Sequence, residues 1–278
     1  MAEITADAVR ALRERTNLPL MKVKQALQQA DGDPERAVEI LKSQVKGLLD
    51  NRAANVTREG RIFVLTTPDG SEAAMVEVQC ESSPVAGCEG FLKLGEALVT
   101  QLLQGPPVAD PAALLAQPVP GGKGTLQDLL DEQLNQIREK MVVSRVIRVK
   151  GPVGYYIHHD GKTGVLFQAD GQNLLAPILR DVAMHVAALK PTVARVEEVD
   201  PALVQRERDR LTAEAKATGK PDNIIEKMVD GKMRVYFRDE AGVLTEQMFA
   251  KDDSKSVSQV LAESGLKAKA FTLWVLGN

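Results

Sequence analysis

Two Asp-Gly turns constrain the fold of this chain more than any other feature of its sequence. Each turn joins two short runs rich in β-branched and aromatic residues: 61–65 and 74–78 around Asp69-Gly70, and 153–157 and 164–167 around Asp160-Gly161. Asp-Gly between two such runs is a strong signal of a β-hairpin. A stretch with helical periodicity follows each hairpin, so the order strand, turn, strand, helix occurs twice. The sequence therefore predicts an α+β core in two halves, at 60–150 and 151–278.

Other segments complete the two halves. The helix after the first hairpin has one apolar face, made of Phe91, Leu94, Leu98 and Leu102. Residues 105–124 are rich in Pro, Ala and Gly and predict an irregular excursion. The remaining predicted elements are a helix at about 126–139, a strand at 142–149, a helix at 174–189 and a closing strand at 270–276.

Residues 1–50 predict a compact bundle of three short helices. Apolar residues recur at helical spacing in three stretches: Val9 and Leu12, then Leu20, Val23, Leu27 and Ala30, then Ala37, Ile40 and Leu41. Thr5 is placed to cap the first helix, and Asp33-Pro34 is a cap followed by proline at the first helical position. A bundle of this size is too small to enclose a catalytic cleft. Residues 51–59 are polar and without pattern, so we interpret them as a linker.

Two charged helices are predicted between Pro201 and Phe237, on either side of Gly219-Lys220-Pro221. Their apolar residues would face each other in an antiparallel hairpin: Leu203, Leu211 and Ala215 on the first helix, and Ile224, Ile225, Met228 and Met233 on the second. Because the pair carries little apolar surface, we expect an insertion at about 200–237 that protrudes from the second half of the core.

Composition argues against several classes of function. The net charge is −3 and aromatic residues make up 4% of the chain, which disfavours a general nucleic-acid binder. The two cysteines, Cys80 and Cys88, and the three histidines match no common metal-ligand spacing, so no metal site is expected. The N-terminus lacks the features of a signal peptide, and no stretch approaches the roughly 18 apolar residues of a membrane span. These features predict a cytoplasmic protein.

Two segments imitate a phosphate-binding loop but fail its spacing. Gly161-Lys162-Thr163 has Tyr156 where the motif requires glycine, and Gly121-Gly122-Lys123-Gly124-Thr125 fails the same test. The chain also has no GxSxG elbow for a nucleophile. We expect His185 to be a hydrogen-bonded core residue, and His158 to lie at an exposed hairpin edge where it contacts a partner. No catalytic group and no cofactor site is therefore predicted.

Several segments resemble elongation factor Ts, and they follow that family's order over nearly the whole chain. The matching blocks are 4–6 with 9–16, 21–27 with 30–33 and Ala37, 77–81 with Val85, Ala86 and Phe91, 183–188 with Lys190-Pro191, and 219–221 with 225–233. Each block alone is weak, but the ordered set is specific. By this resemblance the chain is identified as a divergent bacterial member of the family.

The resemblance implies both a fold and a function. The implied fold is an N-terminal ubiquitin-associated-like bundle that docks on a GTPase, a two-part α+β core and an inserted coiled-coil hairpin. The implied function is guanine nucleotide exchange on elongation factor Tu, which releases GDP and allows GTP to load during translation elongation. The partner would be bound in its GDP-bound and nucleotide-free forms, without a cofactor, a membrane or direct contact with nucleic acid. The sequence leaves a homodimer open.

The clearest departure from the family lies just after Cys80. Where the family usually carries Thr-Asp-Phe-Val-Ala, this chain has Ser82-Ser83-Pro84-Val85-Ala86. By resemblance, this turn enters the GTPase near its nucleotide and dislodges Mg²⁺. Pro84 fixes its own φ and biases Ser83 toward an extended backbone, so the turn would still be stiff, with Glu81 as a replacement charge. The alternative is a plain connection in which Ser82 or Ser83 caps the next helix.

Two other functions compete with nucleotide exchange. An RNA- or ribosome-associated scaffold without exchange activity would use Arg145, Arg148 and Lys150 along one strand, and its affinity for RNA would fall steeply with salt. An enzyme with an unrecognised site would show turnover by the isolated protein.

Overall fold

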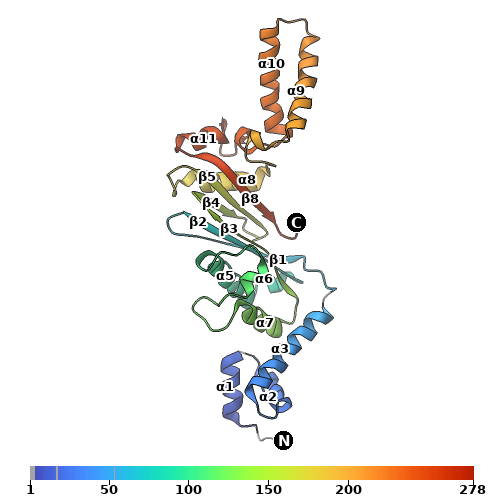
Figure 1. Cartoon of the computed structure of the whole chain (residues 1–278), viewed down its shortest axis with the longest axis vertical. Coiled ribbons are helices and arrows are strands. Elements are labelled where there is room, and N and C mark those ends of the chain that lie inside the picture. The colour runs from blue at the N-terminus through green and yellow to red at the C-terminus, as the bar shows by residue number, and fades with distance from the viewer. Residues whose placement is uncertain (1–3, 17, 53) are drawn as a thin grey trace. The chain divides into compact units, whose positions relative to one another are not determined.

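The computed structural model describes residues 4–16, 18–52 and 54–278. The fold is α+β, with helices packed against small sheets (Figure 1). The chain forms two compact units, each built from more than one stretch: the first from 1–65, 74–148 and 275–278, the second from 66–73 and 149–274. The sequence-based statements about residues 1–3, Asn17 and Ala53 fall outside the described residues.

Three helices begin the first unit: α1 (Ala6–Thr16), α2 (Leu20–Gln29) and α3 (Pro34–Asn51). Their shared core contains Val9, Leu12, Leu18, Val23, Ala26, Leu27, Ala30, Ala37 and Leu41. The predicted caps form, because the Thr5 hydroxyl accepts the Ala8 N–H and Asp33 accepts those of Glu35 and Arg36. Helix α3 includes Asn51, and the next strand includes Glu59, so regular structure reaches into both ends of the stretch interpreted as a linker.

A three-stranded sheet, ordered β1-β2-β3, supports the rest of the first unit. Its strands are β1 (Glu59–Thr66), β2 (Glu72–Cys80) and β3 (Met141–Lys150), and its helices are α4 (Ser83–Ala86), α5 (Glu89–Gln104), α6 (Pro111–Leu115) and α7 (Leu126–Ile137). The predicted first hairpin and the strand after α7 are both confirmed. Gly70 has a φ of +72° in the hairpin turn, a conformation that glycine adopts without steric cost.

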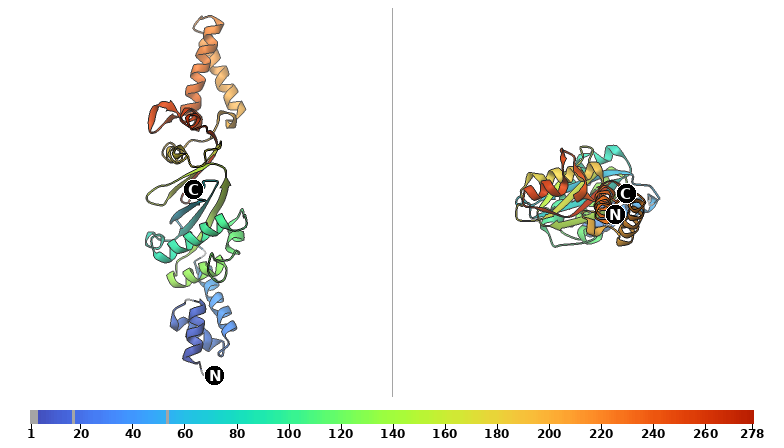
Figure 2. Two further views of the ribbon diagram at one scale, coloured as in Figure 1. Left: turned by 90° about the vertical axis from the view of Figure 1, so that its left-hand side faces the viewer. Right: turned by 90° about the horizontal axis from the view of Figure 1, so that it is seen from above.

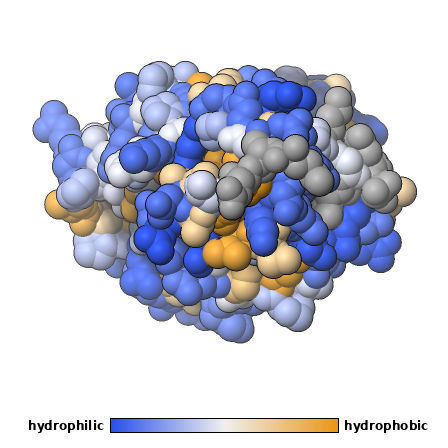
Figure 3. Space-filling model, turned by 90° about the horizontal axis from the view of Figure 1, so that it is seen from below, coloured by the Kyte–Doolittle hydropathy of each residue, from blue (hydrophilic) through white to orange (hydrophobic). Residues whose placement is uncertain are grey.

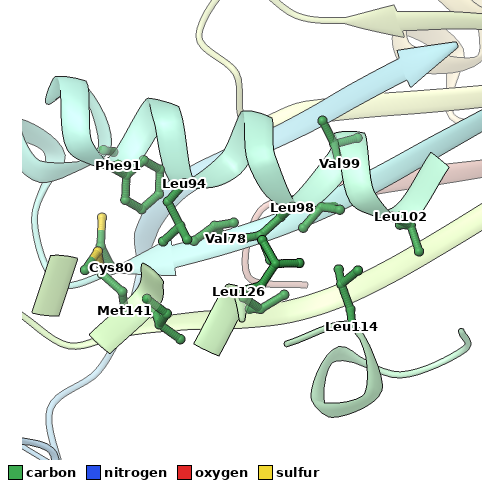
Figure 4. Close-up of a cluster of buried hydrophobic side chains, with 14 of the residues drawn as sticks. Val78, Cys80, Phe91, Leu94, Leu98, Val99, Leu102, Leu114, Leu126 and Met141 are labelled. Carbon is green, nitrogen blue, oxygen red and sulfur yellow. The ribbon is translucent and has the colours of Figure 1, made fainter. Parts of the chain in front are cut away.

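The core of this unit forms where α5 packs on the sheet (Figure 4). The four apolar residues predicted for one face of α5 are all fully buried: Phe91, Leu94, Leu98 and Leu102. Burial of each such side chain stabilises the fold by roughly 1.5–3 kcal/mol. Gly95 lies on the same helix where the Phe63 ring approaches the backbone. A Cβ at Gly95 would lie 2.1 Å from Phe63 Cζ, so a larger residue here would displace the Phe63 ring.

Two boundaries in the first unit differ from the sequence-based prediction. The excursion at 105–124 contains the short helix α6, which Asp110 caps by accepting the Ala113 N–H at 2.8 Å. Helix α7 ends at Ile137, two residues before the predicted end, because Arg138 takes a left-handed conformation with φ +62° and breaks the helical path.

The second unit contains a three-stranded sheet, ordered β4-β5-β8. Strands β4 (Val153–Ile157) and β5 (Thr163–Asp170) form the predicted second hairpin, with Tyr155 opposite Leu166, and β8 (Lys267–Val275) is the predicted closing strand. Helix α8 (Pro177–Leu189) packs directly on β4. A Cβ at Gly154 would lie 2.1 Å from the backbone of Leu179, so glycine permits this close approach.

Helix α8 begins three residues later than predicted. Pro177 occupies its first turn, where a residue without an N–H is tolerated, and Ala176 before it is extended with ψ 125°. Leu175 therefore lies outside the helix and is 68% exposed, although the predicted helix at 174–189 had included it.

The two charged helices are α9 (Pro201–Lys216) and α10 (Asp222–Val235), which lie side by side (Figures 1 and 2). Their buried residues are Leu211, Ala215, Ile225, Val229 and Met233. Leu203 and Ile224 were predicted to face the partner helix, but both are exposed by more than a third. Backbone bonds close the base of the pair, from Thr192 N–H to Gly242 C=O and from Leu244 N–H to Val193 C=O.

Short elements that the sequence pattern did not indicate flank α9 and α10. The single turn η1 (Val196–Glu198) precedes α9, and α10 is followed by the turns η2 (Tyr236–Glu240) and η3 (Leu244–Glu246), the strands β6 (Met248–Phe249) and β7 (Asp252–Ser256), and the helix α11 (Val257–Glu263). Together with α8 and β5 they enclose the apolar core of the second unit, which includes Phe167, Val182, Leu244 and Leu261. Strands and helices this short carry too few residues to show a clear period.

Candidate functional site

The 82–85 turn is a single helical turn set on a fixed base. Ser82 is extended, with φ −132° and ψ 149°, and α4 begins at Ser83. The prediction that Ser83 itself is extended is wrong by one residue, because proline without an N–H fits the first turn of a helix. The turn closes when the N–H groups of Gly87 and Cys88 bond to the carbonyls of Pro84 and Val85.

The turn exposes few of its side chains. Ser83 and Pro84 lie on the surface, whereas Val85 is 9% exposed and joins the α5 core together with Ala86. Val85 is therefore an anchor and Ser83-Pro84 is the exposed tip. Burial also raises the pKa of the neighbouring Cys80 thiol to about 11, so this cysteine is an unreactive core residue at neutral pH.

Glu81 is bound inside the first unit. Its carboxylate accepts both Arg52 Nη1, at 2.8 Å from each oxygen, and Asn55 Nδ2 at 2.7 Å. The Lys140 N–H donates to it as well, at 2.6 Å. Burial acts to raise the pKa of Glu81, but these hydrogen bonds outweigh it and leave the pKa below its usual value. Glu81 is therefore bound by residues of the first unit and is not the free replacement charge that the sequence suggested.

Other carboxylates beneath the turn were not found by sequence reasoning. The Ser82 hydroxyl donates to Glu139 Oε1 at 2.9 Å, and the Ser83 hydroxyl donates to Glu59 Oε2 at 3.1 Å. Ser82 stands at the cap position of α4, but its side chain makes no cap bond. Glu139 lies 57 residues further along the chain, so no local pattern could have linked it to the turn.

His158 follows β4 in the turn of the second hairpin, within the second unit. Its ring is half-buried, and Nδ1 lies 3.0 Å from the Tyr156 hydroxyl. The ring centroid lies 4.2 Å from that of His159, whose side chain is exposed. His158 is thus half-buried at the end of the second hairpin.

A further exposed apolar feature lies at the start of α2. Leu20 is 48% exposed and Met21 is 63% exposed, although the helical spacing had placed Leu20 on the buried face. Figure 3 shows apolar surface set among hydrophilic side chains on the face that it draws. Exposed neighbouring apolar side chains of this kind are common in surfaces that bind other proteins.

Two of the three basic residues of β3, Arg145 and Arg148, have internal partners. Arg145 donates to Glu77, whose side chain is fully buried, and to the Val275 carbonyl. Arg148 Nη1 donates to the carbonyls of Leu102 and Gly105 at 3.3 and 2.9 Å. Two of the three basic residues named in the RNA hypothesis thus bind inside the first unit, whereas Lys150 is exposed and pairs with Glu72 at 3.5 Å.

The remaining sequence motifs have structural roles. Gly161-Lys162-Thr163 lies in the β4–β5 turn and not between a strand and a helix, and Thr125 caps α7. His185 is the predicted core residue, 1% exposed and hydrogen-bonded to Gln247 and Ala250. An open groove of about 610 Å³ in the second unit is lined by Thr66, Thr67, Tyr155, Tyr156, Leu175 and Arg180, among others. None of its lining residues is a histidine, cysteine or carboxylate, so the groove offers no acid–base pair.

The described part of the chain lacks two further kinds of site. No three potential metal ligands among its His, Cys, Asp and Glu side chains come together there. In the same residues, no helix is both long and apolar enough to cross a membrane.

Comparison with known proteins shows the family to which the chain belongs. A family model described as elongation factor Ts matches residues 84–278. The chain is 38% identical over 280 residues to elongation factor Ts of Thiobacillus denitrificans, covering 100% of this chain and 93% of that protein. It is 39% identical over 287 residues to that of Paenarthrobacter aurescens, covering 100% of both chains. It is 34% identical over 289 residues to that of Aquifex aeolicus, covering 99% of this chain and 98% of that protein.

These matches place the chain among the translation elongation factors. Within that class it belongs to the elongation factor Ts family, nucleotide exchange factors for elongation factor Tu, which confirms the sequence-based identification.

Proposed function

We propose that nucleotide exchange by this chain proceeds through the 82–85 turn. The turn enters elongation factor Tu beside its nucleotide and displaces Mg²⁺, which bridges phosphate and protein oxygens. One observation carries this proposal: Ser83 and Pro84 are exposed at the tip, whereas Val85 and Ala86 are anchored in the core. A tip held in this way loses little conformational entropy when it docks, so it can enter a partner without changing its own conformation.

The exchange itself follows from linkage between two ligands of one protein. If the factor binds nucleotide-free elongation factor Tu more tightly than the GDP form, GDP must weaken binding of the factor by the same ratio. A coupling of about 10⁴-fold would require roughly 5.5 kcal/mol of differential contact. No covalent bond is made or broken, so the factor needs no catalytic group.

Other regions supply affinity in this proposal. Residues 1–50 act as a ubiquitin-associated-like docking module, with Leu20 and Met21 as its exposed apolar contacts. Helices α9 and α10 act as a coiled-coil hairpin, and His158 is a second contact on the core. The factor works in the cytoplasm without a cofactor or direct contact with nucleic acid.

The direct test is release of labelled GDP from elongation factor Tu with and without this protein. We expect release to accelerate with factor concentration and to saturate. Titration of the isolated factor with fluorescent GDP should show no saturable binding, because neither lysine-containing motif forms a phosphate loop. Absence of acceleration would refute the exchange function, and micromolar binding of GDP to the factor alone would point to a nucleotide site of its own.

A further inference from the structure

The connection between α7 and β3 holds the 82–85 turn from beneath. Arg138 ends α7 in a left-handed conformation, and the two residues after it both contact the turn region. The Glu139 carboxylate accepts the Ser82 hydroxyl at 2.9 Å, and the Lys140 N–H donates to Glu81 at 2.6 Å. Two consecutive residues of one connection thus bind two consecutive residues at the start of the turn.

Glu139 is held at an energetic cost. Its Oε2 atom is buried and has no hydrogen-bond partner among the described residues. A buried acceptor without a partner lowers the free energy of unfolding, and such an atom in a native fold calls for an explanation. An amide side chain at this position would accept from Ser82 as well, so the contact requires an acceptor and not a charge.

The orientation of α4 depends on contacts outside it. A helix of one turn is unstable by itself, because the conformational entropy lost in forming it exceeds the free energy gained from its few hydrogen bonds. The Ser82 hydroxyl would ordinarily cap α4 by accepting an N–H from its first turn, but it donates to Glu139 instead. The bond between Ser83 and Glu59 lies in an exposed environment, whereas that between Ser82 and Glu139 is partly buried and less screened by water.

We propose that Glu139 is a positioning residue for nucleotide release. By accepting the Ser82 hydroxyl, its carboxylate fixes the angle at which α4 presents Ser83 and Pro84 to elongation factor Tu. It touches neither the nucleotide nor Mg²⁺ and acts through Ser82. This inference rests on the proposed function of the 82–85 turn.

The test compares full-length variants by the maximal rate of GDP release and by the factor concentration that gives half of it. Glu139→Ala removes the acceptor, so the maximal rate should fall about tenfold, the effect of losing a hydrogen bond to a charged group. The half-saturating concentration should stay near that of the wild type, because docking uses other surfaces. Ser82→Ala should behave like Glu139→Ala, and the double variant should be no slower than either single one.

Two variants separate positioning from other effects. Glu139→Gln retains an acceptor for Ser82, so release should remain close to the wild-type rate. Glu96→Gln removes an exposed carboxylate of α5 in the same unit and should change nothing. A wild-type maximal rate in Glu139→Ala, a defect confined to half-saturation, or an equal loss in Glu139→Gln with an unchanged melting temperature would each overturn the proposal.

Amide hydrogen exchange in the free factor tests the positioning role independently of nucleotide release. The N–H groups of Gly87 and Cys88 bond to carbonyls within α4, so their protection reports how firmly the turn is held. Protection should fall in Glu139→Ala and persist in Glu139→Gln. If the wild-type factor does not accelerate GDP release from elongation factor Tu, the proposed function is refuted. The comparison of amide protection between the variants still tests the positioning role of Glu139. Equal protection in all variants would overturn the positioning role.

Discussion

At the scale of single residues, His185 links two parts of the second unit through a neutral imidazole. The Ala250 N–H donates to Nδ1 at 3.1 Å, so Nδ1 carries no proton. Nε2 must then hold the proton that it donates to Gln247 Oε1 at 3.0 Å. Protonation of Nδ1 would place two hydrogens against each other. The histidine therefore joins α8 to the segment around β6 only while it is uncharged.

This geometry predicts a dependence of stability on pH. Burial lowers the pKa of His185 below its usual value of 6.5, although the bond to Gln247 acts in the opposite direction. As pH falls through about 6.5, the unfolded chain takes up a proton that the folded chain resists, so the free energy of unfolding decreases by at most about 1.4 kcal/mol per pH unit. Stability from this group is thus complete above pH 6.5 and is lost toward the folded-state pKa.

Urea unfolding between pH 7.5 and pH 5 measures this effect. His185→Gln should be less stable than the wild type at neutral pH and should show a shallower decline on acidification. His159→Gln removes an exposed histidine and should keep the wild-type slope. An unchanged slope in His185→Gln would show that other groups cause the decline.

At the scale of elements, α4 shows how proline changes the properties of a turn. Pro84 has a restricted φ in the free protein and in any complex, so less conformational entropy is lost when the turn docks. It lies on the surface, and its ring supports no core packing. Its role in the proposed mechanism is therefore to keep the backbone of the tip in one shape.

Pro84→Gly should slow GDP release while the circular dichroism of the free factor stays the same. The glycine variant would lose more conformational entropy when the turn docks, at a cost of roughly 1 kcal/mol, which corresponds to about a fivefold slower rate. Exchange should also become more sensitive to added Mg²⁺, because a softer tip displaces the ion less well. Pro107→Gly, at another exposed proline of the same unit, should exchange like the wild type. Equal rates for Pro84→Gly across the Mg²⁺ range would make α4 a simple connector.

At the scale of the whole molecule, the helical bundle and the α5 core have separate apolar interiors. Two polar side-chain contacts between described residues join them: Lys22 Nζ to Asn135 Oδ1 at 3.1 Å, and Lys42 Nζ to Asp128 Oδ1 at 3.1 Å. The second of these pairs is largely exposed, and pairs of this kind contribute about 0–1 kcal/mol. Because each part has its own apolar core, we expect the helical bundle and the α5 core to fold independently.

Deletion of residues 1–50 should leave a folded core with a melting temperature close to that of the full chain. The deletion keeps Arg52 and Asn55, which bind Glu81 beneath the turn. Affinity for elongation factor Tu should fall about tenfold or more, since loss of apolar anchors costs roughly 1–2 kcal/mol. Calorimetry and titration of the exchange rate would measure the two effects. A core that unfolds without the bundle would show that the two form one cooperative unit.

The sequence by itself determined the elements with strong local signals. Both hairpins, the buried face of α5, the caps of α1 and α3, and the place of α9 and α10 follow from period, turn residues and capping. The family also followed from the sequence, because its blocks occur in the family's order over nearly the whole chain. The structural features are local, since each depends on residues that are close together in the chain.

Tertiary structure alone decided which residues surround the 82–85 turn and which polar groups are free. Glu139 and Glu81 look alike in sequence, yet one binds Ser82 and the other Arg52. Leu20 and Leu203 match a helical period, yet both are exposed, because a period shows which residues share a face and not whether a neighbour covers it. Contacts between residues far apart in the chain depend on packing, and packing is a property of the whole fold.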